Sequence, residues 1–312
     1  MTTSKKADHS FGGELSEITP NWVEHQPLHD LNNLQLGGVA DFYTETDNLE
    51  TLTKLVRLAS GQNIPYSVIG AGTGIIISDY GLPGLVIKNK SHGWNLIGNN
   101  QVLVQSGTSS KELASAMSSR GLGGIEYLVA IPGTVGGALM TKAVSGNHSI
   151  ENYVKETIWF NCRGLECKIV TLNQSDTFKL IDTIKNQYLT EYWTLLSIKL
   201  QLSQLQPEEA LRRLRECHNL AKKYPNDKCL GYFMDKIVPA DLHKDKNFHE
   251  FFRGNIYLHK KDPNFLVIAK QATSNEVKDF CDNLISAFGQ YLGLEYKLRT
   301  DLIGLWPKDE GK

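Results

Sequence analysis

The stretch IPGTVGGA, residues 131–138, most limits how this chain folds, because it places three glycines and a proline in eight positions. Proline lacks a backbone donor and glycine readily adopts positive φ, so a regular helix or strand does not run through such a stretch uninterrupted. A second glycine-rich stretch, GAGTG at residues 70–74, follows an apolar segment typical of a strand. The two stretches predict two tight loops, each of which is either an ordinary turn or a place where the backbone lies against a ligand.

Both loops have the composition of an anion site. Consecutive backbone N–H groups in a tight turn can surround an anion, and the missing glycine side chains let a phosphate approach closely. A Rossmann turn requires a helix to begin at once after its glycines, whereas the strand-like segment IIIS follows residues 70–74. We therefore expect Gly72 and Gly133 to face one phosphate-bearing ligand without a Rossmann architecture, and Gly136→Asp to abolish its binding.

The first part of the chain divides into a lead-in and a lobe. Residues 1–29 show no hydrophobic periodicity and predict a loosely held lead-in. Residues 30–98 read as strand, helix and strand, in which Asn48 caps a helix with one apolar face. This βαβ pattern predicts a first lobe.

Two further α+β regions follow. Residues 99–205 contain a helix opened by Ser109 and a hairpin made of ETIWFN and LECKIVTL, and they predict a second lobe. Residues 206–312 predict a C-terminal α+β domain that begins with an amphipathic helix over 207–224 and ends with a helix capped by Thr273. The predicted fold class is α+β, with two lobes and a third domain.

Composition excludes several classes of partner. The 312 residues include 33 Lys and Arg against 34 Asp and Glu, so no global positive field attracts nucleic acid. No apolar run reaches the roughly 18 residues that a membrane span needs, and no apolar stretch follows the first ten residues as in a signal peptide. We expect a cytoplasmic protein that neither binds nucleic acid nor spans a membrane.

Cysteine and histidine spacing predicts no metal site and no disulfide. The five cysteines are odd in number and include no C-x-x-C pair, so we expect reduced thiols. His243 and His249 are six residues apart in the segment DLHKDKNFHE, a spacing that suits no common ligand pattern. We expect a solvated loop there.

Five stretches spread over roughly residues 30–304 share the pattern of one family: QLGGVADF, VIGAGTGIIISDYGLPGLVI, RGLGGIEYLVAIPGTVGGALM, HSIENYV and GLEYKLRTDLIG. They carry a resemblance to the flavin-dependent UDP-N-acetylenolpyruvoylglucosamine reductases of bacterial peptidoglycan synthesis (the MurB family). It implies a two-lobed FAD-binding fold of the vanillyl-alcohol-oxidase type, with a third domain that closes over the substrate. It also implies that FAD is held by Gly70, Ala71, Gly72, Thr73, Gly74, Pro132, Gly133, Thr134, Val135, Gly136 and Gly137.

The family's three catalytic positions are altered here. The family has an arginine in YR-[DE]-S, a serine in S-A-G-S-x-F and a glutamate in P-E-[VI], which position the substrate and protonate it. The stretches FKLIDTIKNQ, KCLGYFMDK and GLEYKLRTDLIG place Ile181, Tyr232 and Arg299 at these positions. Isoleucine carries no charge for a carboxylate, tyrosine is bulkier than serine, and arginine inverts the charge of glutamate.

Two other residues bear on this resemblance. Lys142 stands where the family has asparagine after GGA, and it either meets a phosphate or faces water. Glu295 is an alternative acid four residues before Arg299, on the same side of an extended chain but about 13 Å away. Neither residue restores the altered constellation.

We therefore expect a non-catalytic MurB-like protein, with or without bound FAD, that serves as a binding or assembly subunit for a protein partner. The alternative is an active FAD-dependent oxidoreductase that uses NADPH. Candidate partner surfaces are the helix 207–224 and the loop HKDKNFHEFFRG, although ordinary solvated surface and domain core are the more common explanation of such segments. The helix carries Arg212, Arg213, Arg215, Lys222 and Lys223, and the loop carries Phe248, Phe251 and Phe252.

Overall fold

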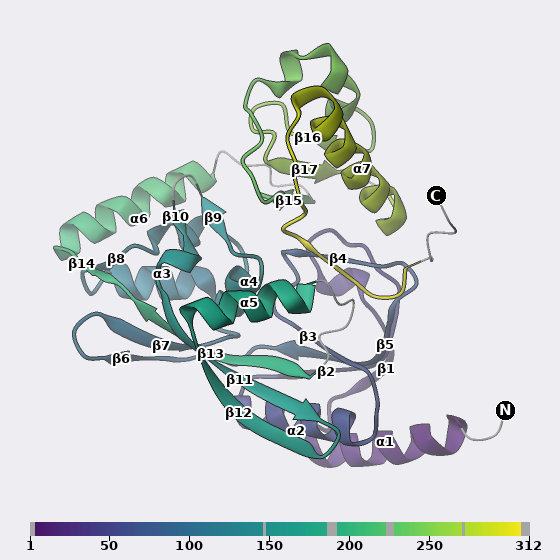
Figure 1. The fold of residues 1–312 in the computed structure, drawn as a ribbon. Coiled ribbons are helices and arrows are strands. Elements are labelled where there is room, and N and C mark those ends of the chain that lie inside the picture. Colours follow the sequence, from purple (N-terminus) through teal and green to yellow (C-terminus); the bar gives the residue numbers. More distant parts are fainter. Residues whose placement is uncertain (1–3, 146–147, 186–191, 223–227, 270–271, 307–312) are drawn as a thin grey trace.

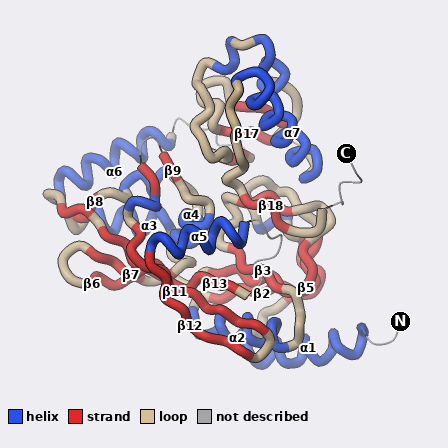
Figure 2. Tube along the Cα trace, viewed as in Figure 1, coloured by secondary structure: helices blue, strands red, loops and turns tan. Residues whose placement is uncertain are grey.

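Two lobes lie side by side and a third domain sits above them in the computed structural model (Figures 1 and 2). The structure describes residues 4–145, 148–185, 192–222, 228–269 and 272–306. None of the helices in these ranges combines the length and apolarity needed to cross a membrane.

The first lobe is a four-stranded sheet in the order β1-β2-β5-β3, in which β2, β5 and β3 are parallel and β1 is antiparallel to β2. Helix α2 packs on it, and the Asn48 side chain accepts the Thr51 N–H at 2.8 Å, so the predicted cap is confirmed. Its elements are β1 (Val23–Pro27), β2 (Val39–Thr46), α2 (Leu49–Gly61), β3 (Tyr66–Ile69), β4 (Ile75–Ile77) and β5 (Leu82–Asn89).

The predicted lead-in is wrong, because most of it is regular structure. Helix α1 (Ser4–Ile18) and strand β1 occupy this segment. Phe11 and Leu15 of α1 are fully buried in the cluster that includes Phe42 of β2 and Leu52 of α2. Two apolar residues at i and i+4 anchor the helix, too few to produce a periodic pattern in the sequence.

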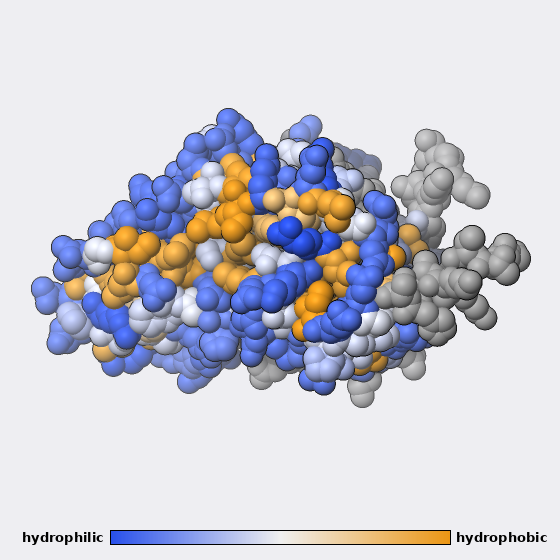
Figure 3. Space-filling view, turned by 90° about the horizontal axis from the view of Figure 1, so that it is seen from below, coloured by the Kyte–Doolittle hydropathy of each residue, from blue (hydrophilic) through white to orange (hydrophobic). Residues whose placement is uncertain are grey.

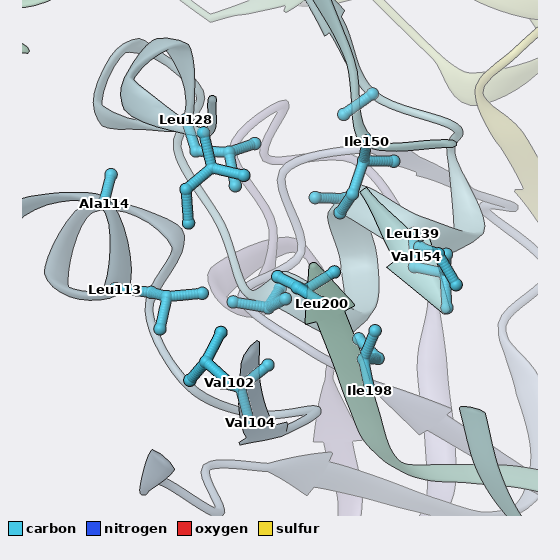
Figure 4. Packing of buried hydrophobic residues seen from close by; sticks show 14 of the residues in the cluster. Val102, Val104, Leu113, Ala114, Leu128, Leu139, Ile150, Val154, Ile198 and Leu200 are labelled. Carbon is cyan, nitrogen blue, oxygen red and sulfur yellow. The ribbon is translucent and has the colours of Figure 1, made fainter. Parts of the chain in front are cut away.

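The second lobe is an antiparallel five-stranded sheet in the order β12-β11-β13-β7-β6, against which α4 and α5 pack, while β11 also contacts α2 of the first lobe. Figure 4 shows apolar side chains from β7, β13 and α3 meeting in its core. Its elements are β6 (Trp94–Ile97), β7 (Gln101–Gln105), α3 (Ser110–Ser118), β8 (Leu122–Gly123), α4 (Val135–Met140), β9 (Val144–Ser145), β10 (His148–Ser149), β11 (Val154–Arg163), β12 (Glu166–Asn173), α5 (Gln174–Lys185), β13 (Trp193–Gln201) and β14 (Ser203–Gln204).

Helix α6 (Pro207–Ala221) packs on the second lobe, whereas the sequence assigned it to the third domain. It contacts α3 and the turn Glu126–Ala130, and its Leu214 and Cys217 pack against the second-lobe core. The sequence placed the boundary between the second lobe and the third domain at residue 206, before this helix, whereas in the structure the helix packs on the second lobe.

The third domain combines a small sheet of order β15-β17-β16 with helix α7 (Ser274–Ala287). Both hydrogen bonds of the predicted Thr273 capping box are present. The chain then returns to the first lobe, where β18 (Asp301–Ile303) pairs in parallel with β4. The remaining strands are β15 (Cys229–Gly231), β16 (Ile256–Leu258) and β17 (Phe265–Ile268).

The prediction of reduced thiols is wrong for one cysteine pair. Cys162 and Cys167 stand opposite each other in the predicted hairpin β11–β12, with Cα atoms 4.0 Å apart, and form a disulfide. The short spacing C-x-x-x-x-C gave no disulfide signal, because only the strand register brings the two residues together. Cys217, Cys229 and Cys281 lie outside this disulfide.

Candidate functional site

A cavity of about 710 Å³ lies where the two lobes and the third domain meet, and both glycine loops line it. Gly72 and Gly133 thus face one space, as predicted, and the volume falls within the range of about 300–1,000 Å³ typical of ligand pockets. The lining residues include all of Gly70–Gly74 together with Pro132, Gly133, Thr134, Gly136 and Gly137. Val135 does not line the cavity, because its side chain is buried in the second-lobe core.

The first glycine loop joins β3 to β4 and packs directly on the second loop. Gly72 has φ +72°, and a Cβ there would lie 2.2 Å from the Leu31 carbonyl oxygen, so the position requires glycine. The Thr73 hydroxyl donates to the Pro132 carbonyl at 2.8 Å. These contacts fix the two loops relative to each other.

The second glycine loop leads into the short helix α4. Gly133 has φ +130°, and the Thr134 hydroxyl caps the helix by accepting the Gly137 N–H at 3.1 Å. Gly136 donates its N–H to the Ser106 carbonyl, and a Cβ on Gly136 would lie 2.7 Å from that same oxygen. The substitution Gly136→Asp would therefore disrupt packing against Ser106. The structure thus gives a steric reason for an effect of this substitution, in place of the predicted direct clash with a phosphate.

Backbone donors of the first loop remain available to a ligand. Within the part of the chain that the structure describes, no acceptor is hydrogen-bonded to the N–H groups of Ala71, Gly72 or Thr73. Three consecutive N–H donors beside a cavity form a nest that suits an anion such as the diphosphate of FAD. The residues present therefore fit this group, and their individual roles as FAD ligands stay predictions.

The floor of the cavity between the lobes is mainly apolar. The side chains that form it belong to α4, α5, β11 and β13, and they include Met140, Trp159, Ile184, Trp193 and Leu195. A flat aromatic ring system packs favourably on such a surface. The cavity thus offers a polar end at the loops and an apolar end between the lobes.

The third domain contributes Tyr232, Lys297 and Arg299 to the opposite wall. Tyr232 has φ +52°, an uncommon value for a residue other than glycine, and its ring packs edge-on against Phe265. Arg299 donates from Nη2 to the Asp235 carbonyl at 2.8 Å. Burial lowers the pKa of Arg299 from its ordinary value, while the negative charge of Asp235 acts in the opposite direction.

Ile181 does not reach the cavity. It lies on α5 with no exposed surface and packs within the second-lobe core, while Ile184 of the same helix lines the cavity. Of the three altered family positions, the structure therefore brings Tyr232 and Arg299 to the cavity and leaves Ile181 outside it.

The two residues considered as substitutes also lie elsewhere. The Lys142 ammonium forms an ion pair with Asp182 of α5 at 2.6 Å, so it neither meets the cavity nor simply faces water. Glu295 is exposed and is not part of the cavity lining.

Sequence reasoning missed several residues of the lining. Asn33, Cys229 and Lys297 line the cavity although none of them was expected to be a site residue. Lys297 had a detectable signal, because it stands two residues before Arg299 and therefore on the same side of an extended chain. Asn33 and Cys229 meet only through the tertiary contact between the first lobe and the third domain, where the Asn33 amide donates to the Cys229 carbonyl.

Of the two candidate partner surfaces, the loop is less accessible than expected, whereas the arginines of α6 stay exposed. Phe248, Phe251 and Phe252 are buried in the core of the third domain. On α6, Arg212 and Arg213 pair with glutamates of the same helix. Lys223 lies outside the described residues.

The lower face of the molecule carries both apolar and hydrophilic residues (Figure 3). Seen from below, apolar residues on that face form several groups separated by hydrophilic ones (Figure 3). This mixed character is ordinary for a protein surface.

Comparison with known proteins agrees with this architecture. Residues 40–164, which include both loops, match the FAD binding domain family. The UDP-N-acetylenolpyruvoylglucosamine reductase of Synechococcus sp. (strain JA-3-3Ab) is 26% identical over 258 residues, which cover 80% of this chain and 81% of that protein. The enzyme of the same name from Trichlorobacter lovleyi is 28% identical over 308 residues, which cover 94% of each.

A solved structure shares the whole fold. The crystal structure of UDP-N-acetylenolpyruvylglucosamine reductase (MurB) from Thermus caldophilus has a TM-score of 0.64 and 21% identity, and the match covers 91% of this chain and 98% of that one. The predicted two-lobed FAD-binding fold with a third domain is thereby confirmed. Residues 40–164 thus match the FAD binding domain family, and the chain is similar to UDP-N-acetylenolpyruvoylglucosamine reductases over most of its length.

Proposed function

We propose that this chain binds FAD and acts as a flavin-dependent oxidoreductase of the MurB type. The observation that carries the proposal is the single cavity that joins both glycine loops to the third domain. A protein used only as a scaffold needs the packed core and not an open space beside three backbone N–H donors.

The residues of this cavity divide between a cofactor end and a substrate end. The N–H groups of residues 71–73 would hold the diphosphate, and the apolar floor around Trp193 would hold the ring system. Bound FAD would supply hydride transfer to a substrate held beside its ring. The third-domain wall, with Tyr232 and Arg299, would hold that substrate and exclude water from it.

The relatives indicate the substrate to test first, UDP-N-acetylenolpyruvoylglucosamine, with NADPH as the reductant. Reduction of its double bond requires a proton donor in the cavity. The Tyr232 hydroxyl is the group at the altered serine position that could donate a proton. Such a reaction belongs in the cytoplasm, where NADPH and nucleotide sugars are available.

The altered family positions favour a second candidate, a flavin-binding protein without reductase activity that serves as a subunit of an assembly. Ile181 is buried in the core and supplies no cation to a substrate carboxylate. Loss of one well-placed electrostatic group typically lowers the rate by about 10²–10³-fold. If this candidate is correct, flavin-loaded protein turns over near background.

One experiment separates the candidates. Purified protein is reconstituted with FAD, its absorbance spectrum is recorded, and NADPH oxidation is measured with and without the enolpyruvyl sugar nucleotide. Substrate-dependent turnover on the order of 1 per second, within the ordinary range for enzymes, supports the first candidate. A yellow protein that oxidises no NADPH in the presence of the nucleotide supports the second, and a colourless protein contradicts both.

A further inference from the structure

The charges that line the cavity are few and unevenly placed. Among the described residues of its wall, the cations are Lys297 and Arg299, both on the third domain, and the one acid is Asp301. Ile181 is buried and supplies no cation, and Lys142 is paired with Asp182 outside the cavity. Any anionic group of a substrate that enters beside the flavin therefore meets the third domain.

Arg299 is held in place by its own segment. Its backbone N–H donates to the Phe233 carbonyl at 2.8 Å, and Leu298 pairs antiparallel with Met234. The guanidinium is fixed further by the hydrogen bond from Nη2 to the Asp235 carbonyl. A side chain that is anchored before the ligand arrives loses little conformational entropy on binding.

The acids around Arg299 support its charge and leave the cavity wall positive. Asp235 and Glu151 are close enough to favour the charged form of the guanidinium, and neither lines the cavity. The Asp235 carboxylate instead accepts the backbone N–H of Lys297 at 2.8 Å. A guanidinium in a partly buried wall, with its fork of N–H donors, is well suited to a carboxylate or a phosphate.

We propose that Arg299 is the specificity-determining residue of this cavity and binds an anionic group of the substrate from the third-domain side. The proposal rests on the proposed function for the presence of a substrate next to the flavin. It gives Arg299 a role in binding, at a position where the resemblance to the family places an acid. Lys297 contributes less, because it is exposed and screened by solvent.

The test is equilibrium binding to FAD-loaded protein, followed by the change in flavin fluorescence. The two probes are UDP-N-acetylenolpyruvoylglucosamine, which carries a carboxylate, and UDP-N-acetylglucosamine, which lacks it. Arg299→Gln is compared with Arg299→Lys and with the matched control Arg253→Gln, an exposed arginine of the same domain outside the cavity. Melting temperatures of all variants establish that each is folded.

We expect Arg299→Gln to weaken binding by about 10- to 150-fold, the range for hydrogen bonds to charged groups, while Arg299→Lys retains part of the affinity and Arg253→Gln all of it. A loss confined to the enolpyruvyl probe identifies the carboxylate as the bound anion, and an equal loss for both probes identifies the diphosphate.

Three results overturn the proposal: unchanged binding by Arg299→Gln, an equal loss in Arg253→Gln, or failure of the unsubstituted protein to bind either probe. If Arg299→Gln does not fold, the test uses Arg299→Lys and the salt dependence of binding by the unsubstituted protein. An affinity that does not fall as the salt concentration rises counts against the proposal. Tight binding without NADPH oxidation rejects the proposed reductase function and leaves this inference standing.

Discussion

Gly137 offers a sharper test of FAD binding than Gly136. It lines the cavity and is exposed, and a Cβ there would meet only the Thr134 hydroxyl, at 3.3 Å. Gly137 is also the third residue of α4 after the cap Thr134, a position where an acidic side chain stabilises a helix. The substitution Gly137→Asp should therefore leave the folded protein at least as stable.

The same substitution should repel the cofactor. Thr134 Oγ1 lies 3.1 Å from the Gly137 nitrogen and 2.6 Å from where a Cβ on Gly70 would stand, so the new carboxylate would lie close to the first loop. Two like charges about 7 Å apart repel by about 2 kcal/mol at an effective dielectric constant of about 20. Each phosphate charge at that distance from the carboxylate would therefore raise the Kd for FAD by about 30-fold.

The assay is titration of apoprotein with FAD, followed by quenching of flavin fluorescence, with Gly137→Asn as the neutral control of similar shape. We expect weakened binding for Gly137→Asp, near-normal binding for Gly137→Asn, and melting temperatures of the apoproteins within a few degrees of each other. Binding of FAD by Gly137→Asp within threefold of the unsubstituted protein refutes the placement of the diphosphate, as does an equal loss in Gly137→Asn.

Three further predictions concern the frame of the site. Gly72→Ala should lower the free energy of unfolding by more than about 1–2 kcal/mol, because the positive φ costs that much and the new Cβ overlaps the Leu31 carbonyl; urea denaturation measures it, and an unchanged midpoint contradicts the loop geometry. Ile181→Arg should destabilise the protein by more than about 3 kcal/mol and restore no activity, since the side chain points into the core; a stable, more active variant would show that position 181 faces the cavity. Thiol titration of unfolded, unreduced protein should find three of the five cysteines, and Cys281 should not react in the native protein at pH 8, because burial raises its pKa to about 12; five reactive thiols contradict the disulfide Cys162–Cys167.

Local chemistry made the loops and caps predictable from the sequence. The clusters at residues 70–74 and 131–137 contain the glycines that the observed positive φ values require, at Gly72 and Gly133. The caps at Asn48 and Thr273 depend on side chains two or three residues from the groups that they satisfy. Features of this kind leave a short-range signal in the sequence.

Long-range packing was not predictable in the same way. Helix α1 is held by Phe11 and Leu15 against residues of the first lobe, and α6 could pack on either neighbour because its apolar face specifies no partner. The site shows the same limit, because the resemblance identified position 181 as important and only the structure shows that its side chain turns into the core. Lys297 and Cys229 joined the lining through the docking of the third domain.

The pairing of β18 with β4 has a consequence for the order of biosynthesis. Strand β4 begins directly after the first glycine loop, and the Asp301 N–H of β18 donates to the carbonyl of Gly74, the last residue of that loop. Asp301 follows both lobes and the elements of the third domain in the chain, so the loop gains this neighbour only after all of them have been synthesised. Capture of the flavin is therefore expected to be a late event, after both lobes have had time to fold on the ribosome.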